Sequence, residues 1–309
     1  MKILKPKFWD QNYFTFLSIL LLPITFFYGL IIFLRKKLVS QKKFPISVIC
    51  VGNIYVGGTG KTPLSIHIFN ILKKKFKPGI IRKYYESHLD EINLIKNKVK
   101  KIYYKKDRSK AILEASKDGR NIVILDDGFQ DQFIHKDLSI ICFNDVDLIG
   151  NGLLLPAGPL REPFTNINKA KIVVINGKKN KKFEEKIKTI SKKVKIFYTE
   201  YISDNALKFR GKKILAFAGI GNPNSFYNLL RKNKLNLIKT INFPDHYNFK
   251  KEEVKRIINY AKNKKLKVVT TEKDYYRLKL LGIKNIHYIS IKLKIHKEVE
   301  FKKELLKNI

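Results

Sequence analysis

The stretch Ile46-Ser-Val-Ile-Cys-Val-Gly-Asn53, followed by Gly57-Gly-Thr-Gly-Lys-Thr-Pro63, decides the fold of this 309-residue chain. The first part is a short, β-branched apolar run, which predicts a buried strand. The second part predicts a glycine loop that opens a helix, because Pro63 is tolerated in the first helical turn, where its missing N–H is not needed. A strand, a loop ending in Gly-Lys-Thr and a helix, in this order, indicate a phosphate-binding loop.

The glycine loop has the chemistry of a nucleotide-binding site. Its glycines let successive backbone N–H groups turn inward on a polyphosphate, and the helix dipole favours the same anion. Lys61 can reach the outer phosphates, and the Thr62 hydroxyl can bind Mg²⁺. The strict motif has glycine five residues before Gly60, where this chain has Tyr55, so the loop is a variant. The residues expected to bind ATP are Tyr55, Val56, Gly57, Gly58, Thr59, Gly60, Lys61 and Thr62. An ordinary glycine-rich turn is the alternative.

A second apolar run, Asn121-Ile-Val-Ile-Leu125, predicts another buried strand, and Asp126-Asp-Gly-Phe-Gln130 follows it. In nucleotide-binding α/β folds, a carboxylate at such a strand end holds Mg²⁺ directly or through water. Adjacent aspartates point in different directions, so one is expected to face the metal while the other orients the loop or the acceptor. The expected metal ligands are Thr62, Asp126 and Asp127, and the sequence leaves open which aspartate contacts the ion. A turn capped by Asp-Gly is the alternative.

The N-terminal region is apolar over 21 uncharged residues, Phe14 to Leu34, and ends in Arg35-Lys36-Lys37. This length could cross a bilayer, although Pro23 and Gly29 are expected to weaken or kink the helix. Signal peptides have shorter apolar cores and a small-residue cleavage site, so we expect the segment to be retained. The basic residues that follow it favour a cytoplasmic location for the bulk of the protein.

Two alternatives remain open for this region. The helix could lie in the membrane interface, with Lys7, Trp9, Tyr13 and Tyr28 at headgroup depth. It could also be a buried helix of the protein core.

The charge of the chain is strongly positive, with 64 basic and 26 acidic residues and a net charge of +38. Such a charge favours nucleic acid or an anionic membrane as partner. The excess is mostly lysine, scattered through every segment, whereas arginine is the residue suited to bidentate recognition of phosphates and bases. We therefore favour a compositional bias, with attraction to anionic lipid or to a phosphorylated substrate as the alternative, and expect no nucleic-acid partner. Cys50 and Cys142 lie far apart in apolar runs, which indicates a reducing compartment.

Together these motifs resemble the tetraacyldisaccharide 4'-kinase family, whose members add the 4'-phosphate to the lipid A disaccharide precursor. The resemblance runs over nearly the whole chain and includes the N-terminal apolar segment and both motifs above. Its further segments are Gly150-Asn-Gly152 with Leu155-Pro-Ala-Gly-Pro-Leu-Arg-Glu162, Phe217-Ala-Gly-Ile-Gly-Asn-Pro223, Phe243-Pro-Asp-His246, and Thr270-Thr-Glu-Lys-Asp274 with Arg277.

The resemblance implies an ATP- and Mg²⁺-dependent kinase that acts on the 4'-hydroxyl of a tetraacyldisaccharide 1-phosphate at the cytoplasmic face of the bacterial inner membrane. The expected α/β fold has an N-terminal membrane-anchoring helix (residues 1–45), a P-loop NTPase-like parallel-sheet domain (46–205) and a smaller C-terminal α/β domain (206–309) that closes the active-site cleft. The expected partners are the acylated disaccharide lipid and the inner-membrane surface, and the protein is expected to be a monomer.

The resemblance also implies roles for single residues. Asp90 matches the catalytic base and His246 the histidine that orients it, and Lys61 and Asp127 complete the catalytic set. The residues expected to bind the acceptor are Glu91, Gln130, Arg161 and Glu162. The chain departs from the family pattern in Ile81-Arg-Lys-Tyr-Tyr85, where the family shows Ser-Arg-Gly-Tyr-Gly, and in Leu89-Asp-Glu-Ile92, where it shows Gly-Asp-Glu-Pro. We expect a differently shaped loop at the acceptor site.

Other interpretations are weaker. Thr271-Glu-Lys-Asp274 follows an apolar run, so its carboxylates could contact the nucleotide or the domain interface, or the segment could simply cap a helix. A P-loop GTPase or metallochaperone would share the glycine loop, but the chain has no guanine-reading element like Asn-Lys-x-Asp. A membrane-tethered nucleic-acid-binding protein would explain the charge but would leave the loop at 57–62 unexplained. Salt-dependent binding to DNA, without nucleotide hydrolysis, would favour this alternative.

Overall fold

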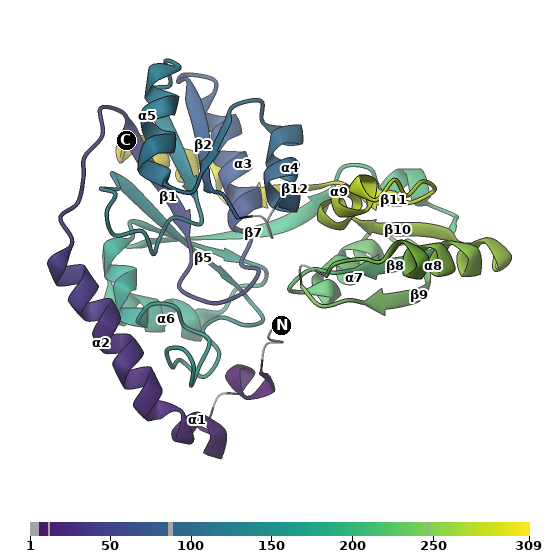
Figure 1. Cartoon of the computed structure of the whole chain (residues 1–309), viewed down its shortest axis with the longest axis horizontal. Helices are drawn as coiled ribbons and strands as arrows, with labels where there is room; N and C mark the ends of the chain where they lie inside the picture. The colour runs from purple at the N-terminus through teal and green to yellow at the C-terminus, as the bar shows by residue number, and fades with distance from the viewer. Residues whose placement is uncertain (1–5, 12, 86–88, 246) are drawn as a thin grey trace. The chain divides into compact units, whose positions relative to one another are not determined.

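A computed structural model describes residues 6–11, 13–85, 89–245 and 247–309, with the backbone alone for Leu89 and Asp90. The chain divides into two compact units. In Figure 1 the colour follows the residue number, from purple at the N-terminus to yellow at the C-terminus. The first unit contains the chain up to Lys83, Lys101–Glu200 and Ile295–Ile309. The second contains Tyr84–Lys100 and Tyr201–Lys294. Both are α/β, as the sequence predicts.

The first unit is built around an eight-stranded sheet with the order β12-β7-β6-β5-β1-β4-β2-β3. All neighbouring pairs from β7 to β3 are parallel. The strands of this sheet are β1 (Ser47–Gly52), β2 (Pro78–Lys83), β3 (Ile102–Lys105), β4 (Ile122–Asp126), β5 (Leu138–Asn144), β6 (Ile172–Asn176), β7 (Lys195–Ser203) and β12 (Ile291–Ile295). The last residues of β7 and all of β12 except Ile295 are counted in the second unit. The central strands are buried on both faces, which explains their continuous apolar sequences.

Helix α3 (Lys61–Leu72) begins at the lysine of the glycine loop. Its buried residues Leu64, Ile68 and Leu72 recur every four positions and form one face, which packs on β1, β2 and β4. The sheet therefore holds the start of α3 at the ends of the central strands. The other helices of the first unit are η1 (Lys7–Asp10), α1 (Phe16–Leu20), α2 (Leu22–Leu38), α5 (Arg108–Lys117), η3 (Phe164–Lys169), α6 (Lys181–Ile190) and α10 (Glu298–Lys307).

The N-terminal apolar region forms two helices instead of one. Helix α1 ends at Leu20 and α2 begins at Leu22, one residue before Pro23. Proline has no N–H to donate to the carbonyl four residues earlier, so a continuous helix would lose a hydrogen bond here. In the part of the chain that the structure describes, no helix has the length and apolar character needed to cross a membrane. The N-terminal helix expected in residues 1–45 is present as α1 and α2, and its role as a membrane anchor stays a prediction.

The two alternatives for this region have different outcomes. The buried core helix is wrong, since most large apolar side chains of α1 and α2 are exposed. A helix in the membrane interface stays a prediction, in which Trp9 is buried against the protein and its indole N–H donates to the carbonyl of Pro156 at 3.0 Å.

The second unit has a smaller, all-parallel sheet with the order β11-β10-β8-β9. Its strands are β8 (Lys213–Ala218), β9 (Asn236–Asn242), β10 (Lys267–Thr271) and β11 (His287–Ile289), and its helices are α4 (Leu89–Lys98), η4 (Ala206–Phe209), α7 (Pro223–Lys232), α8 (Lys251–Asn263) and α9 (Glu272–Leu280). After β8 the chain forms β9 on one side of that strand and then β10 on the other. The carboxyl ends of β8 and β10 therefore form the topological switch point, where such sheets bind ligands.

A carboxylate of the protein occupies this switch point. Asp274 is fully buried and accepts hydrogen bonds from the Gly219 N–H and the Thr271 hydroxyl, both at 2.8 Å. Arg277 pairs with the other carboxylate oxygen at 2.7 Å. Burial raises the pKa of Asp274, although Arg277 and the hydrogen bonds oppose that rise. Thr271 caps α9 through its hydroxyl, so the helix-cap interpretation of this segment is confirmed.

Helix α4 belongs to the second unit although it lies between β2 and β3 in the sequence. It packs against α9, and two ion pairs connect the helices. Glu91 pairs with Lys273 at 2.9 Å, and Lys98 pairs with Glu272 at 2.8 Å. Glu91 and Lys98 are seven residues apart, or two helical turns, so both lie on the face of α4 that meets α9.

Candidate active site

The glycine loop is held by two asparagine side chains. Asn53 Nδ2 donates to the Thr59 hydroxyl at 3.0 Å and to the Gly57 carbonyl at 3.4 Å. Asn144, at the end of the neighbouring strand β5, donates to the Gly58 carbonyl at 3.1 Å. In a trans peptide the next N–H points opposite to the carbonyl, so the amides of Gly58 and Thr59 are turned away from the asparagines. Neither N–H faces the asparagine that holds the carbonyl before it, so both are oriented for an anion cradle on the loop's other side.

The loop depends on glycine at its two ends. The backbone has φ of 146° at Gly57 and 86° at Gly60, both in the region that side chains disfavour. Gly60 directly precedes the first residue of α3, so the turn at Gly60 delivers the loop to the positive end of the helix.

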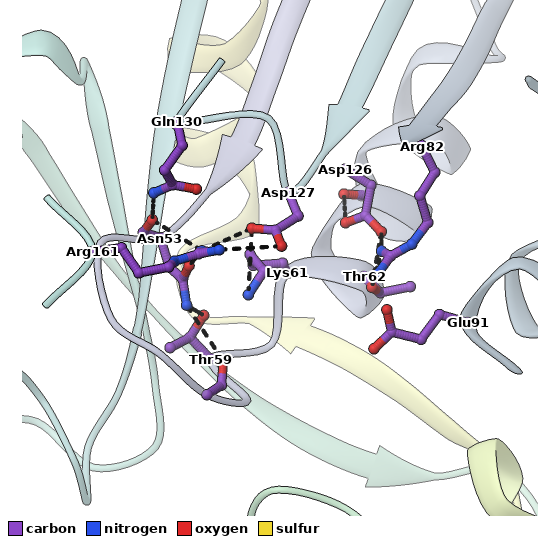
Figure 2. Close-up of polar contacts among 12 residues, drawn as sticks. Asn53, Thr59, Lys61, Thr62, Arg82, Glu91, Asp126, Asp127, Gln130 and Arg161 are labelled. Carbon is purple, nitrogen blue, oxygen red and sulfur yellow. Dashed lines mark hydrogen bonds and ion pairs between the residues drawn. The ribbon is translucent and has the colours of Figure 1, made fainter. Parts of the chain in front are cut away.

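A charged triad lies beside the loop, as Figure 2 shows. Asp127 follows β4 with φ of 58° and directs its carboxylate to Lys61 Nζ at 3.7 Å. Arg161 approaches the same carboxylate with both terminal nitrogens, at 2.9 and 3.5 Å. The Arg161 guanidinium also donates to the side-chain and main-chain oxygens of Asn53. Two cations, one carboxylate and the loop-holding asparagine thus form one network.

This network shifts the pKa values of its members. Burial lowers the pKa of Lys61, and Arg161 adds to that effect while Asp127 opposes it. Burial acts to raise the pKa of Asp127, but Lys61 and Arg161 outweigh it and hold the pKa well below its ordinary value. Asp127 is therefore ionised at neutral pH. A bound polyphosphate would favour the charged form of Lys61, since it adds negative charge near the ammonium group.

The second aspartate has different partners. Asp126 is fully buried and accepts hydrogen bonds from the Thr62 hydroxyl at 2.9 Å and the Ser65 hydroxyl at 3.0 Å. Arg82, on the adjacent strand β2, forms a short ion pair with the same carboxylate and donates to the Thr62 hydroxyl at 3.3 Å. Figure 2 shows that the two neighbouring carboxylates point to separate partner sets.

The oxygens of Thr62 and Asp126 suit Mg²⁺. This ion prefers oxygen ligands and commonly uses one or two protein ligands together with water and substrate phosphates. Across the described residues, no group of three or more His, Cys, Asp or Glu side chains is arranged to hold a metal. The residues present therefore fit a magnesium ion that arrives with nucleotide better than an all-protein metal site.

Two of the predicted ATP-binding residues have protein partners. Tyr55 is buried in the hydrophobic core, and its hydroxyl donates to Asp10 at 3.3 Å. The N–H of Val56 donates to the Pro159 carbonyl at 2.9 Å. Both residues anchor the beginning of the loop.

The predicted acceptor-binding residues have protein partners. Gln130 donates to the Asn53 carbonyl at 2.7 Å. Glu162 is buried and accepts a hydrogen bond from Asn166, and burial raises its pKa. Glu91 is paired with Lys273 in the second unit. In the first unit Arg161, Gln130 and Glu162 hold loops around the site.

The predicted base and its partner are described only in part. Asp90 is the second residue of α4, and its side chain lies outside the described residues. His246 lies outside them entirely.

The sequence analysis missed three residues of the site: Arg82, Asn53 and Asn144. Arg82 and Asn144 are polar residues at the ends of otherwise apolar strands, and Asn53 directly follows such a strand. Because carboxyl ends of parallel strands meet at one edge of a sheet, polar residues there were a usable signal.

Comparison with known proteins gives relatives over nearly the full chain. The family model described as tetraacyldisaccharide-1-P 4'-kinase matches residues 17–309. The tetraacyldisaccharide 4'-kinase of Pelagibacter ubique is 41% identical over 315 residues, covering 99% of this chain and 98% of that protein. The protein of the same name from Rickettsia bellii is 32% identical over 295 residues, covering 90% of each.

A solved structure agrees with these relatives. The crystal structure of LpxK from Aquifex aeolicus in complex with ATP superposes with a TM-score of 0.71 at 27% identity, covering 94% of this chain and 99% of that one. The resemblance found in the sequence motifs is therefore confirmed. On the match over residues 17–309 and these full-length relatives, the chain belongs to the tetraacyldisaccharide-1-P 4'-kinase family.

Proposed function

We propose that this protein transfers the γ-phosphate of ATP to the 4'-hydroxyl of a tetraacyldisaccharide 1-phosphate, a step of lipid A biosynthesis. The family match over residues 17–309 carries this conclusion. The cradle of Gly57 to Thr62 supports it, because it combines aimed amides, a lysine and a helix N-terminus, as nucleotide binding requires.

The nucleotide would lie with its outer phosphates against the amides of Gly58 and Thr59. Phosphoryl transfer needs the donor and acceptor oxygens in line and stabilisation of the charge on the moving group. Lys61 and Arg161 supply positive charge beside the cradle. Asp127 holds both cations in place, because its carboxylate forms an ion pair with each of them.

Magnesium is the proposed cofactor, held by Thr62 and by Asp126 directly or through water. When bound, it would neutralise charge on the β- and γ-phosphates. We assign Asp126 to this role because its carboxylate lies 2.9 Å from the hydroxyl of Thr62, the residue that the loop motif assigns to the ion. The Arg82 ion pair fixes the orientation of the Asp126 carboxylate.

Asp90 is the proposed general base, with His246 as the group that orients it and tunes its pKa. A carboxylate in hydrogen-bond reach of the acceptor hydroxyl can take its proton late in the transfer. Asp90 lies at the amino end of α4, one residue before Glu91, which anchors the helix to Lys273. This anchor would limit the movement of the base.

The proposed location is the cytoplasmic face of the bacterial inner membrane, with α1 and α2 lying on the bilayer. Large apolar side chains are exposed along both helices, among them Phe16, Ile24, Phe26, Phe27 and Leu38. Arg35, Lys36 and Lys37 in the last turn of α2 would contact anionic headgroups. An acceptor with four acyl chains leaves the bilayer at a cost of about 0.8 kcal/mol per CH₂, so the enzyme must reach it there.

The test is transfer of labelled γ-phosphate from ATP to a tetraacyldisaccharide 1-phosphate by the purified chain in detergent. We expect a lipid product that gains one phosphate, and Lys61→Ala should lose most of the turnover while exposed Lys267→Ala keeps it. Absence of labelled lipid with the wild-type protein, under conditions where it binds ATP, would reject the proposed acceptor.

A further inference from the structure

Helix α2 has an unusual distribution of polar and apolar residues. Thr25 is buried and Tyr28 and Gly29 are partly buried, and their spacing of three and four places them on one helical face. This narrow face meets the protein, whereas the bulky apolar residues face outward. An ordinary surface helix has the opposite arrangement. The outer partner of α2 must therefore be apolar, which fits the lipid surface proposed above.

The polar face of α2 makes specific contacts with the loop of residues 151–161. The Tyr28 hydroxyl donates to the Arg161 carbonyl at 3.1 Å, and the Ala157 N–H donates to the Thr25 hydroxyl at 3.0 Å. Gly29 lies against Leu154, where an added Cβ would meet the leucine side chain at 3.3 Å. The preceding segment adds the Trp9 bond to Pro156. Figure 1 shows α2 as a long helix at the edge of the first unit, to which it belongs.

The same loop supports the nucleotide site. The Arg161 N–H donates to the Ile54 carbonyl at 2.7 Å, and the Pro159 carbonyl accepts the Val56 N–H at 2.9 Å. The backbone of Arg161 is therefore bound on one side by α2 and on the other by the beginning of the glycine loop. Its guanidinium contacts Asp127 and Asn53. Arg161 therefore connects helix α2 to the phosphate cradle.

We propose that Thr25 and Tyr28 are positioning residues that couple the docking of α2 on lipid to the binding of ATP. Lipid that orders α2 also orders the 151–161 loop, and with it the guanidinium of Arg161 beside the cradle. Nucleotide bound beside Arg161 orders the same contacts from the other side. The coupling rests on the proposed docking of α2 on lipid, and it adds a link between that surface and the catalytic site.

The coupling makes a reciprocal prediction. If vesicles tighten ATP binding by some factor, saturating ATP must tighten vesicle binding by the same factor. One hydrogen bond to the loop corresponds to about a 2- to 10-fold change in affinity. Tyr28→Phe removes this hydroxyl and keeps the ring, so it should abolish most of the coupling while α2 still binds lipid.

The first measurement is the binding of labelled Mg²⁺-ATP to the full chain, with and without vesicles of one part phosphatidylglycerol to three parts phosphatidylethanolamine. The second is sedimentation of the protein with the same vesicles, with and without ATP. The wild type should show equal factors of about 2 to 10 in both directions. Tyr28→Phe should give factors near 1 with unchanged sedimentation in the absence of ATP. Tyr260→Phe, which removes an exposed hydroxyl in the second unit, should behave as wild type.

The outcomes separate this inference from the proposed function. Wild-type protein that binds both vesicles and ATP, each unaffected by the other, overturns the coupling and leaves the kinase and its membrane location intact. Full coupling in Tyr28→Phe overturns the role of the hydroxyl. Failure of the wild type to bind vesicles overturns the membrane location and the coupling together. Native fluorescence of the buried Trp9 in Tyr28→Phe shows that the variant is folded.

Discussion

Replacing Arg82 by alanine is expected to destabilise the first unit strongly, because it leaves a buried carboxylate without its cation. Asp126 is 0% exposed and Arg82 is 5% exposed. Removing one partner of a buried ion pair costs about 3–5 kcal/mol. Asp126 keeps two hydroxyl donors, Thr62 at 2.9 Å and Ser65 at 3.0 Å, after the change. We therefore expect the lower end of that range, about 3 kcal/mol.

Urea unfolding followed by tryptophan fluorescence measures this loss. Trp9 is the single tryptophan of the chain and lies buried in the first unit, so its signal reports on that unit. With a slope of about 2 kcal/mol per molar urea, the midpoint of Arg82→Ala should fall by about 1.5 M.

The double variant tests the physical cause. Arg82→Ala combined with Asp126→Asn leaves neither charge of this pair buried. The double variant should therefore lose less stability than the sum of the two single-variant losses, by about 1 kcal/mol or more. Losses that add within about 0.5 kcal/mol would refute the ion-pair explanation. Exposed Lys105→Ala, which breaks the surface pair with Glu114, should change stability by less than about 1 kcal/mol.

Three further predictions concern catalysis and pH. Asp90→Asn should lower kcat for lipid phosphorylation about 100-fold or more with ATP affinity unchanged; normal turnover would reject Asp90 as the base. Lys273→Ala removes one ion-pair partner of Glu91 and loosens α4, so kcat should fall while the KM for ATP stays constant, and a selective rise in that KM would contradict this. Because the folded pKa of Asp127 lies below its ordinary 3.8, its contribution to stability is present above that pH and is lost as the pH falls further. The free energy of unfolding in urea should therefore fall more steeply below pH 3.8 for the wild type than for Asp127→Asn. Parallel plots of that free energy against pH would contradict the lowered pKa of Asp127.

The core of the nucleotide site could be predicted because its signals are local. A β-branched run, a glycine loop and a helix beginning at Lys61 occur in sequence order, and each has its own physical reason. The adjacency of β1 and β4, with Val51 opposite Asp126, brings the second motif to the first. That adjacency is the usual outcome when two fully apolar strands must both be buried in one parallel sheet.

The supports of the site depend on pairing register, which the sequence does not show. Arg82 reaches Asp126 because the two residues are partners in the β2–β4 pair. Asn144 reaches the Gly58 carbonyl because β5 lies beside β1. A shift of one residue in either pair would turn these side chains to the other face of the sheet. Residue type alone marks them as polar strand ends and gives no partner.

The N-terminal region illustrates a different limit. Its apolar composition predicts helix and lipid contact, and Pro23 marks the place where the helix breaks. Hydropathy does not reveal that Trp9 and Tyr28 turn their polar groups toward the protein. Those groups are satisfied by carbonyls of the 151–161 loop, more than 100 residues away in the sequence. Only the folded chain brings them together.

The grouping of α4 with the second unit has a consequence for how the protein can be divided. The chain passes between the units four times, after residues 83, 100, 200 and 294. A fragment that ends at Glu200 would keep α4 but lose α9, and the buried Ile92 and Ile95 of α4 would lose their packing. Lys98 would also lose Glu272, an ion pair whose carboxylate is buried. The helix that carries Asp90 therefore needs residues 201–294 for its own stability, so the proposed catalytic base and the C-terminal sheet cannot be separated by a single cut.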